Sequence, residues 1–396
     1  MAVFAFCAAV CAFVFWSTET PWGKRIYRIV PSIVLIYYLP TLASNIGVIP
    51  TSSPAYDWMR DYLLPCSLFI LMVSTDVPTI LGIGPKAIGI MLAGTLGVVI
   101  GGPIAFLLCK SFLDPDAWKG LAALSGSWIG GGANFAAIKE SVGAPDSIIG
   151  PIIIVDTAVG YTWMGILMVL ANYREKVDRW LRADARILDE LSVRLAAFEQ
   201  KESRPARLPD VSMVLALGFV GAVVCTNLAN WWYARSNAWM EQSMPSVASI
   251  FTSFTWLVIF ISTIGILLSF TRFRKLEARG ASKLGYAGLY LFLTSIGAKA
   301  DVAGILSAPI LLLVGAIWIL VHVAIILLVA RWLRAPLFLA AVGSQANIGG
   351  AASAPVLAAA YYPSMAPVGL LMGVLGYLVG NYAGLLCAFL LRLASG

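Results

Sequence analysis

Two short stretches of the chain combine glycine with hydroxyl and amide side chains, a combination that suits the binding of a small polar ligand. They are Leu124–Phe135 (LSGSWIGGGANF) and Val342–Ser353 (VGSQANIGGAAS). Glycine lets backbone approach a ligand closely, carbonyls freed by a helix break can coordinate a cation, and N–H groups at a helix start can hold a carboxylate. Tight helix packing through small residues is the alternative explanation. The predicted substrate- and ion-binding residues of the two stretches are Ser125, Ser127, Gly130, Gly131, Gly132, Asn134, Ser344, Gln345, Asn347, Gly349, Gly350 and Ser353.

One acidic residue, Asp156, lies within an apolar run (PIIIVDTAVGY) and is followed by Thr157. A carboxylate at membrane depth costs at least about 2.5 kcal/mol unless it is hydrated or paired, so a functional role is the first hypothesis. Asp156 could act as a sodium ligand or as a titrating proton carrier. A buried carboxylate bonded to hydroxyl groups for structural reasons is the alternative. We predict sodium or a proton as the coupling ion, and no other cofactor.

A few further polar residues lie in or beside apolar runs. His322 is the single histidine, and it is either a satisfied core residue or a proton relay. Asp76 and Asp301 are near expected helix ends, where an acid is solvated, caps a helix, or takes part in gating. Tyr377 and Asn381 are secondary candidates for the ligand pathway.

The composition is that of a membrane protein. Of the 396 residues, 60% are hydrophobic and 12% are charged, whereas a soluble domain has about 25% charged residues, and the mean hydropathy is +0.87. The net charge of +7 is explained by Lys and Arg in cytoplasmic loops, without a nucleic-acid partner. We predict an integral membrane protein in contact with the lipid bilayer.

About ten apolar runs suit helices that cross a membrane, which requires about 20 residues each. The two glycine-rich stretches are additional, and unpaired backbone cannot face lipid. The basic loops, above all 173–207, should be cytoplasmic. This rule favours re-entrant hairpins, with both termini outside, over crossing helices that are broken at the middle.

Three short motifs occur twice in the same order. Asp76–Leu81 resembles Asp301–Leu306, Ile129–Gly131 resembles Ile348–Gly350, and Gly160–Tyr161 resembles Gly376–Tyr377. Because each half would contain five crossings, an odd number, the second copy should be inverted relative to the first. We therefore predict an all-α polytopic membrane protein made of two inverted repeats, each with about five transmembrane helices and one glycine-rich re-entrant or broken helix. The expected boundaries are residues 1–171 for the first repeat, 172–210 for a cytoplasmic linker and 211–396 for the second repeat.

The linker has apolar residues at three- and four-residue spacing, from Val177 to Phe198, with charged residues between them. This periodicity predicts an amphipathic helix. It would lie on the membrane or on the neighbouring domain, or it would contribute to a dimer contact.

The stretches SGSWIGGGANFAAIKE, DVPTILGIGPKA and GSQANIGGAASAPVLAAAYYP resemble the YjcL-like bacterial membrane family, whose function is unknown, over essentially the whole chain. The architecture is more distantly similar to sodium/glutamate and sodium/citrate symporters. That resemblance implies inverted halves, paired hairpins with glycine-rich tips, elevator-type movement and a homodimer. The second glycine-rich stretch has no arginine of the kind a dicarboxylate carrier would use, so we expect a neutral solute or a monocarboxylate, including an amino acid.

Together these features predict an ion-coupled secondary transporter of a small polar solute. A channel or membrane receptor without transport coupling is the alternative. A membrane enzyme would need a nucleophile–base pair or a metal cluster, and His322 is far in sequence from any serine motif, so we expect no enzymatic activity.

Overall fold

The computed structural model describes the chain except for residues 28–31, 185, 189–206, 249 and 301–307. The described part is helical and contains no β-strand, as the sequence predicts. Six of its helical segments are long and apolar enough to cross a membrane, or seven if α14 and η4, which meet at a bend of 94°, form one span.

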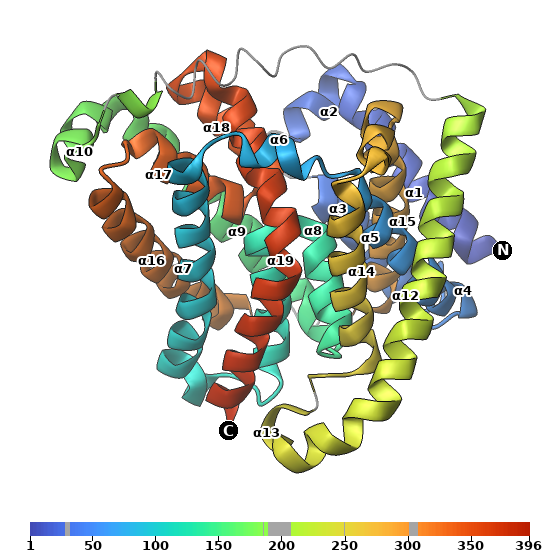
Figure 1. The fold of residues 1–396 in the computed structure, drawn as a ribbon. Coiled ribbons are helices and arrows are strands. Elements are labelled where there is room, and N and C mark those ends of the chain that lie inside the picture. The colour runs from blue at the N-terminus through green and yellow to red at the C-terminus, as the bar shows by residue number, and fades with distance from the viewer. Residues whose placement is uncertain (28–31, 185, 189–206, 249, 301–307) are drawn as a thin grey trace.

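The helices form two groups, each drawn from both ends of the chain, which lie on the right and on the left of Figure 1. In the first group, α3 and α5 pack on α15, and α12 packs on α14 and α5. The first helix group consists of α1 (Ala2–Glu19), α2 (Pro21–Ile26), α3 (Ser32–Asn45), α4 (Pro54–Trp58), the π-helix η1 (Met59–Leu63), α5 (Leu64–Ser74), α12 (Leu208–Ser243), α13 (Pro245–Ala248), α14 (Ser253–Ser269), the 3-10 helix η4 (Arg272–Arg279) and α15 (Ala281–Lys299).

The second helix group contains both glycine-rich stretches. Its most extensive contacts join α8 with α19, α7 with α16, and α18 with α19. Contacts between the two groups are smaller, and α14 makes several of them, with α8 and α19. The second helix group consists of α7 (Pro85–Cys109), η2 (Lys110–Phe112), α8 (Ala117–Ser141), α9 (Asp146–Leu170), η3 (Ala171–Tyr173), α10 (Arg174–Leu181), α16 (Ala308–Leu333), α17 (Leu337–Ile348), α18 (Gly350–Tyr361), η6 (Pro363–Met365) and α19 (Ala366–Ser395).

The run from Leu63 to Leu81, which the sequence suggests is one crossing, is divided. α5 ends at Ser74, Thr75 is extended, and a short helix, α6 (Val77–Leu81), begins after Asp76, whose carboxylate accepts a hydrogen bond from the Thr79 N–H group at 3.4 Å. Proline at the second position of α6 cannot continue a preceding helix, because its ring clashes with the carbonyl four residues earlier. α6 therefore links the first group to the second.

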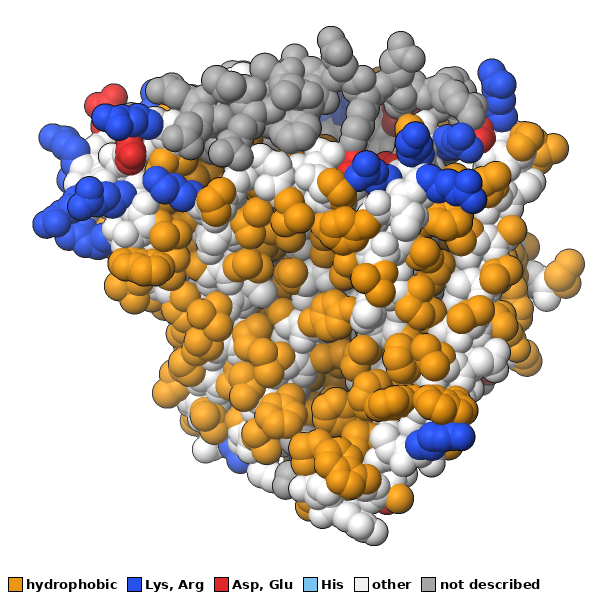
Figure 2. All heavy atoms as spheres, in the orientation of Figure 1, with side chains coloured by type: hydrophobic (Ala, Val, Ile, Leu, Met, Phe, Trp, Pro, Cys, Tyr) orange, Lys and Arg blue, Asp and Glu red, His pale blue; other side chains and the backbone are white. Residues whose placement is uncertain are grey.

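Charge is distributed unevenly over the surface. Figure 2 shows Lys and Arg side chains along the upper rim and a broad hydrophobic band below it. The rim includes α10 and the first turns of α12, which Figure 1 places at the same end of the molecule. The basic segments predicted to be cytoplasmic thus share one end.

The linker helix ends earlier than its periodicity suggests. α10 stops at Leu181, and Arg182 adopts a left-handed conformation with φ 55°. A left-handed residue terminates the helical hydrogen-bond pattern. Residues 186–188 are helical again, but most of the remaining predicted helix, including Phe198, lies outside the described residues. The second copy of the repeated motif, Asp301–Leu306, lies entirely outside them.

Candidate functional site

The helix α8 folds back on itself at the first glycine-rich stretch. Gly131 has φ 71° and ψ −168°, a conformation that glycine adopts far more readily than other residues. Gly126 and Asn134 would be separated by a rise of about 12 Å on a straight helix. A methyl group built on Gly126 would instead lie 2.6 Å from the Asn134 carbonyl oxygen. The two arms of α8 are therefore neighbours, and we call Ala117–Ser141 hairpin 1.

The helices α17 and α18 form a second unit of the same kind, which we call hairpin 2 (residues 337–361). α17 ends before Gly349, and Gly350 has φ 61°. Across the two arms, the Gln345 side-chain amide donates a hydrogen bond to Ser353 Oγ at 2.7 Å. The breaks predicted from the two glycine-rich stretches are thus confirmed, at Gly131 and at Gly349–Gly350.

The two hairpins enter the second group from opposite ends of α19. Both ends of hairpin 1 line one cavity of about 500 Å³, through Trp118 and Glu140 among others. Arg392, near the end of α19, lies 5.6 Å from the centre of the Trp118 ring. Hairpin 2 leads directly through η6 into the start of α19. The glycine tips therefore meet beside the middle of this helix.

One aromatic ring lies against both tips. A methyl group built on Gly131 would be 3.3 Å from Tyr377 Cε1, and one built on Gly350 would be 3.6 Å from the same atom. The ring of Tyr377 also lies beside that of Tyr286 on α15, with ring centres 6.3 Å apart. Tyr377, a secondary candidate in the sequence, therefore lies at the centre of the site.

Asp156 on α9 is bonded to hairpin 1. Its carboxylate accepts hydrogen bonds from Ser127 Oγ at 2.7 Å and from Trp128 Nε1 at 2.9 Å. The residue is half-buried, and none of the described Lys, Arg or His side chains forms an ion pair with it. Thr157 beside it is also half-buried. An acid held by two neutral donors keeps its charge available for a cation or a proton.

The same face of α9 also reaches hairpin 2. Trp163 follows Asp156 by two helical turns, and its Nε1 atom donates to Ser344 Oγ at 2.8 Å. Ser344 Oγ is also 2.8 Å from His322 Nε2, and His322 Nδ1 is 2.9 Å from the Gly94 carbonyl oxygen. Because that carbonyl can only accept, a neutral imidazole carries its proton on Nδ1 and accepts from Ser344. Both ring nitrogens of His322 are thus bonded within the protein.

Asn347 fixes hairpin 2 to α7. Its side-chain oxygen accepts from Thr95 Oγ1 at 2.8 Å, and its nitrogen donates to the carbonyls of Met91 and Gly343 at 3.0 and 2.9 Å. A completely buried amide with these partners has few remaining bonds to offer a ligand. The structure places Asn347 where it positions the hairpin.

Two other amides of the predicted site keep an unpaired oxygen. Asn134 donates weakly to the carbonyls of Gly376 and Tyr377 at 3.4 and 3.3 Å, and its Oδ1 atom is buried without a partner among the described residues. Gln345 Oε1 is likewise buried without a hydrogen-bond partner among the described residues. A buried acceptor without a partner is costly and uncommon in folded proteins. Each hairpin thus carries one amide that can accept a further hydrogen bond when the tip rearranges.

The remaining predicted residues lie at the margins of the site. Ser125 is completely buried and donates to the Ala122 carbonyl at 2.6 Å within its own helix. Gly132 faces the first helix group: a methyl group built on Gly132 would lie 3.4 Å from Ile33 Cδ1. Gly130 is packed against Asn134 and the Gly376 carbonyl. The structure thus brings the tips together with Asp156 but leaves Ser125 in a packing position.

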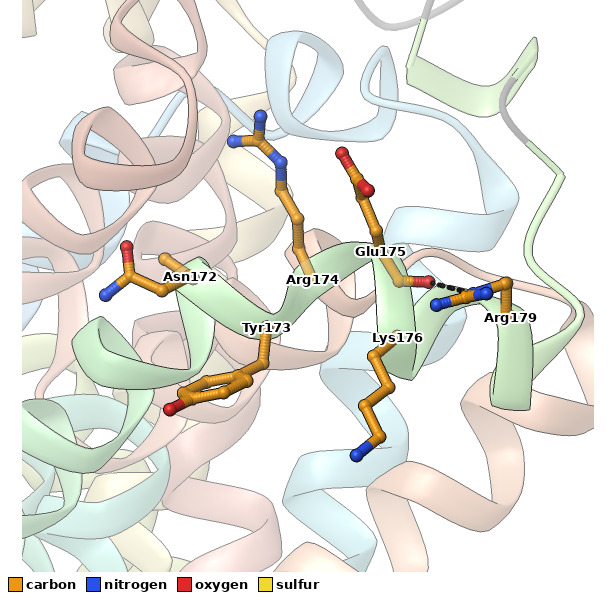
Figure 3. Close-up of a pocket in the computed structure, with 7 residues that line it drawn as sticks. Asn172, Tyr173, Arg174, Glu175, Lys176 and Arg179 are labelled. Atoms are coloured by element: carbon orange, nitrogen blue, oxygen red, sulfur yellow. Dashed lines mark hydrogen bonds between the residues drawn. The ribbon is translucent and has the colours of Figure 1, made fainter.

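A separate cavity of about 420 Å³ lies at the start of α10, and α10 contacts both ends of hairpin 2. Asp178 accepts a hydrogen bond from the first N–H group of α17, Leu337, at 2.6 Å. Arg174 lies 5.3 Å from the ring centre of Tyr362, directly after α18. In Figure 3 the side chains of Arg174 and Lys176 leave the helix on different sides. The cavity therefore has no converging basic groups. It is lined by Ala171, Asn172, Tyr173, Arg174, Glu175, Lys176 and Arg179.

Two tryptophans at this site were not predicted from the sequence. Trp128 and Trp163 each donate an indole N–H to the polar network, and Trp128 also packs on Trp318 with ring centres 5.1 Å apart. A buried tryptophan usually finds a partner for its N–H group. For Trp163, the sequence offers one indication: it follows Asp156 by seven residues, which places both on the same face of a helix.

The fold and the site define a polytopic, all-helical integral membrane protein. The chain belongs to the family described as a protein of unknown function (DUF819), whose model matches residues 5–394. It is 27% identical over 352 residues to the uncharacterized membrane protein YjcL of Bacillus subtilis (strain 168), an alignment that covers 86% of this chain and 85% of the relative. The predicted membership in the YjcL-like family is thus confirmed.

Proposed function

We propose that the protein is an ion-coupled secondary transporter of a small polar solute, such as an amino acid or a monocarboxylate. One observation carries the proposal: two helical hairpins, one from each half of the chain, approach from opposite ends of α19 and contact the same ring, Tyr377. Broken helices that meet inside the membrane expose backbone groups to a ligand, as at the binding sites of secondary transporters. The proposal includes no enzymatic activity and no cofactor beyond the coupling ion.

Reciprocal contacts support two inverted repeats, with residues 1–171 and 211–396 on either side of the linker 172–210. Ile129 corresponds to Ile348, and Gly160 corresponds to Gly376. A methyl group built on Gly376 would lie 2.3 Å from the Ile129 carbonyl oxygen, and one built on Gly160 would lie 3.5 Å from Ile348 Cγ2. Each hairpin tip thus contacts the last long helix of the other half, as a two-fold relation requires.

The two helix groups support an elevator mechanism, in which the second group moves relative to the first. Each half contributes three helices to the first group, α1, α3 and α5 from the first half and α12, α14 and α15 from the second. Polar contacts between the groups include Arg60 to Glu140 at 2.8 Å and Tyr38 to the Gly150 carbonyl at 2.9 Å. Single polar contacts can be exchanged more easily than an interdigitated core. We further propose that the first group forms a homodimer interface.

The proposed coupling site is Asp156 with Ser127, and the coupling ion is sodium or a proton. The test is uptake by reconstituted proteoliposomes of a panel of labelled amino acids and monocarboxylates, under a sodium gradient or a pH gradient. We expect Asp156→Asn to abolish gradient-driven accumulation. The substitution preserves the size of the side chain, and both its oxygen and its nitrogen can still form hydrogen bonds.

Thermal unfolding of the same preparations serves as the control for folding. Unchanged ion-dependent accumulation by a folded Asp156→Asn protein would remove this residue from the mechanism. Downhill flux without accumulation against a concentration difference would instead favour a channel. An absence of flux for every solute would favour a receptor.

A further inference from the structure

Four tyrosines gather where α9, α15 and α19 approach one another between the two helix groups. The ring centres of Tyr286 and Tyr377 are 6.3 Å apart, with planes inclined by 69°, and those of Tyr286 and Tyr290 are 6.1 Å apart. Tyr161 is on α9, which contacts α15. We call Tyr161, Tyr286, Tyr290 and Tyr377 the tyrosine cluster.

The tyrosine cluster connects the hairpin tips to the space between the groups. Tyr377 lies against Gly131 and Gly350, as described above. Tyr286, its nearest ring neighbour, is half-buried on α15, and Tyr161 on α9 is 44% exposed. A ligand that reaches the tips along this interface would therefore pass the faces of these rings.

Acids and bases both lie near the cluster among the described residues. Asp156 is on the same helix as Tyr161, and Glu277 of η4 bonds to Ser282 at the start of α15, where Lys283 also lies. Among the described residues, the Lys and Arg side chains that lie over aromatic rings are placed on other rings. An anionic group would thus meet the negative faces of aromatic rings, which repel it.

A cation experiences the opposite interaction. The faces of tyrosine rings attract ammonium groups within about 6 Å of the ring centre, and aromatic sites recognise quaternary ammonium compounds in this way. We infer that the tyrosine cluster binds a positively charged nitrogen group of the cargo, so that the cargo is a small organic ammonium compound or a zwitterion. The inference rests on the proposed function, because it assumes that the cargo binds at the hairpin tips.

The arrangement assigns different parts to the four rings. Tyr377 and Tyr286 have inclined planes and would form two walls around the ammonium group, next to the tips. Tyr161 and Tyr290 would line the approach. The N–H groups at the start of α18 also lie near Tyr377, where a carboxylate of a zwitterion would find donors.

The first test compares two ligands of the same shape. Choline and its neutral carbon isostere, in which a tert-butyl group replaces the trimethylammonium group, are titrated into the purified full-length protein by isothermal calorimetry. Glycine betaine and tetramethylammonium are titrated in parallel. We expect at least one of the ammonium compounds to bind, and we expect an isostere without the charge to bind about tenfold more weakly.

The second test locates the site. Tyr286→Leu and Tyr377→Leu should each weaken binding of the ammonium compound by about tenfold, whereas Tyr286→Phe, which keeps the ring, should retain most of the affinity. Tyr382→Leu is the matched control, because Tyr382 is on the same helix as Tyr377 but bonds to Thr263 at 2.7 Å. If Tyr377→Leu does not fold, the pair of Tyr286 variants still decides the question.

Two outcomes would overturn the inference. One is equal affinity for choline and its neutral isostere, or no affinity for any of the ammonium compounds. The other is ammonium binding that the Tyr286 and Tyr377 variants leave unchanged. Transport is measured separately with labelled ligand in proteoliposomes, so binding without uptake would count against the proposed function while leaving the ammonium site in place.

Discussion

The two hairpins have the same shape but are held in different ways. Hairpin 1 is bonded through charged groups: Ser127 and Trp128 donate to Asp156, and Glu140 at its base pairs with Arg60 of the first helix group. Hairpin 2 is bonded mainly through neutral groups, among them Ser344 and Asn347, to helices of its own group.

This difference indicates a division of roles. Charged hydrogen bonds are stronger than neutral ones, so hairpin 1 is the element whose environment would change if Asp156 bound a cation or a proton, as we propose. Neutral bonds from α7, α9 and α16 keep one arm of hairpin 2 in a fixed position. Three comparisons between the hairpins would test this contrast.

The largest difference is expected at the hairpin bases. Glu140 is 8% exposed and pairs with Lys139 at 2.7 Å and Arg60 at 2.8 Å. Removing one partner of a buried ion pair costs about 3 kcal/mol at the lower end of the range, which applies here because Lys139 keeps Asp146 as a second partner at 2.6 Å. Loss of a helix-capping acceptor costs about 1 kcal/mol. Glu140→Ala should therefore lower the free energy of unfolding more than Asp178→Ala. Unfolding by SDS in mixed micelles measures both.

Glu140→Gln is the control for this comparison, because it keeps the side-chain volume and removes the charge. It should recover only part of the loss. Equal costs for the two alanine variants would show that the ion pairs at the base of hairpin 1 contribute no more than a single helix cap.

A smaller difference is expected at the tips. A methyl group on Gly376 would overlap the Ile129 carbonyl oxygen at 2.3 Å, whereas one on Gly160 would make an ordinary contact with Ile348 at 3.5 Å. Overpacking costs about 1–3 kcal/mol, and alanine is favoured over glycine inside a helix by about 0.5–1 kcal/mol. Gly376→Ala should therefore destabilise the protein and Gly160→Ala should be neutral or slightly stabilising, as thermal unfolding in detergent would show. The opposite order would contradict the packing described here.

The smallest difference concerns the two indole bonds of α9 and hairpin 1. Trp128 donates to a carboxylate, and Trp163 donates to a hydroxyl group. A hydrogen bond to a charged group contributes about 1.5–3 kcal/mol and a neutral one about 0.5–1.5 kcal/mol. Trp128→Phe should therefore cost about 1 kcal/mol more than Trp163→Phe in the same SDS titration. Equal costs would mean that Asp156 is uncharged under the conditions of the measurement.

Much of the fold follows from elementary patterns in the sequence. Apolar runs with few charges require helices in a bilayer, and glycine with polar neighbours, as at Gly131 and Gly350, locates the breaks. The division of the run that contains Asp76 was missed. A hydropathy average does not register the acid and Pro78, although the two begin a new helix there.

The residues of the site were harder to predict from the sequence than the fold, because their roles depend on the directions of side chains. Residue type placed Ser125 and Asn347 with the ligand-binding residues, yet their side chains bond within the protein, and only the direction of each side chain distinguishes the two uses. Trp128 and Trp163 were not among the predicted site residues, because the partner of an indole N–H group becomes visible only in three dimensions. Tyr377 is central because both hairpins reverse direction beside it. The sequence predicts the two breaks, but it does not indicate which side chain they contact.

The helix α10 has a mechanical consequence. It continues from α9 through a single 3-10 turn, η3, and it contacts both ends of hairpin 2 through Asp178 and Arg174. The helix α9, which carries Asp156, is thereby connected through α10 to both ends of hairpin 2. A shift of α9 along its axis would therefore move both ends of hairpin 2. Under the proposed function, ion binding at Asp156 would affect hairpin 2 without a direct contact between the ion and the solute.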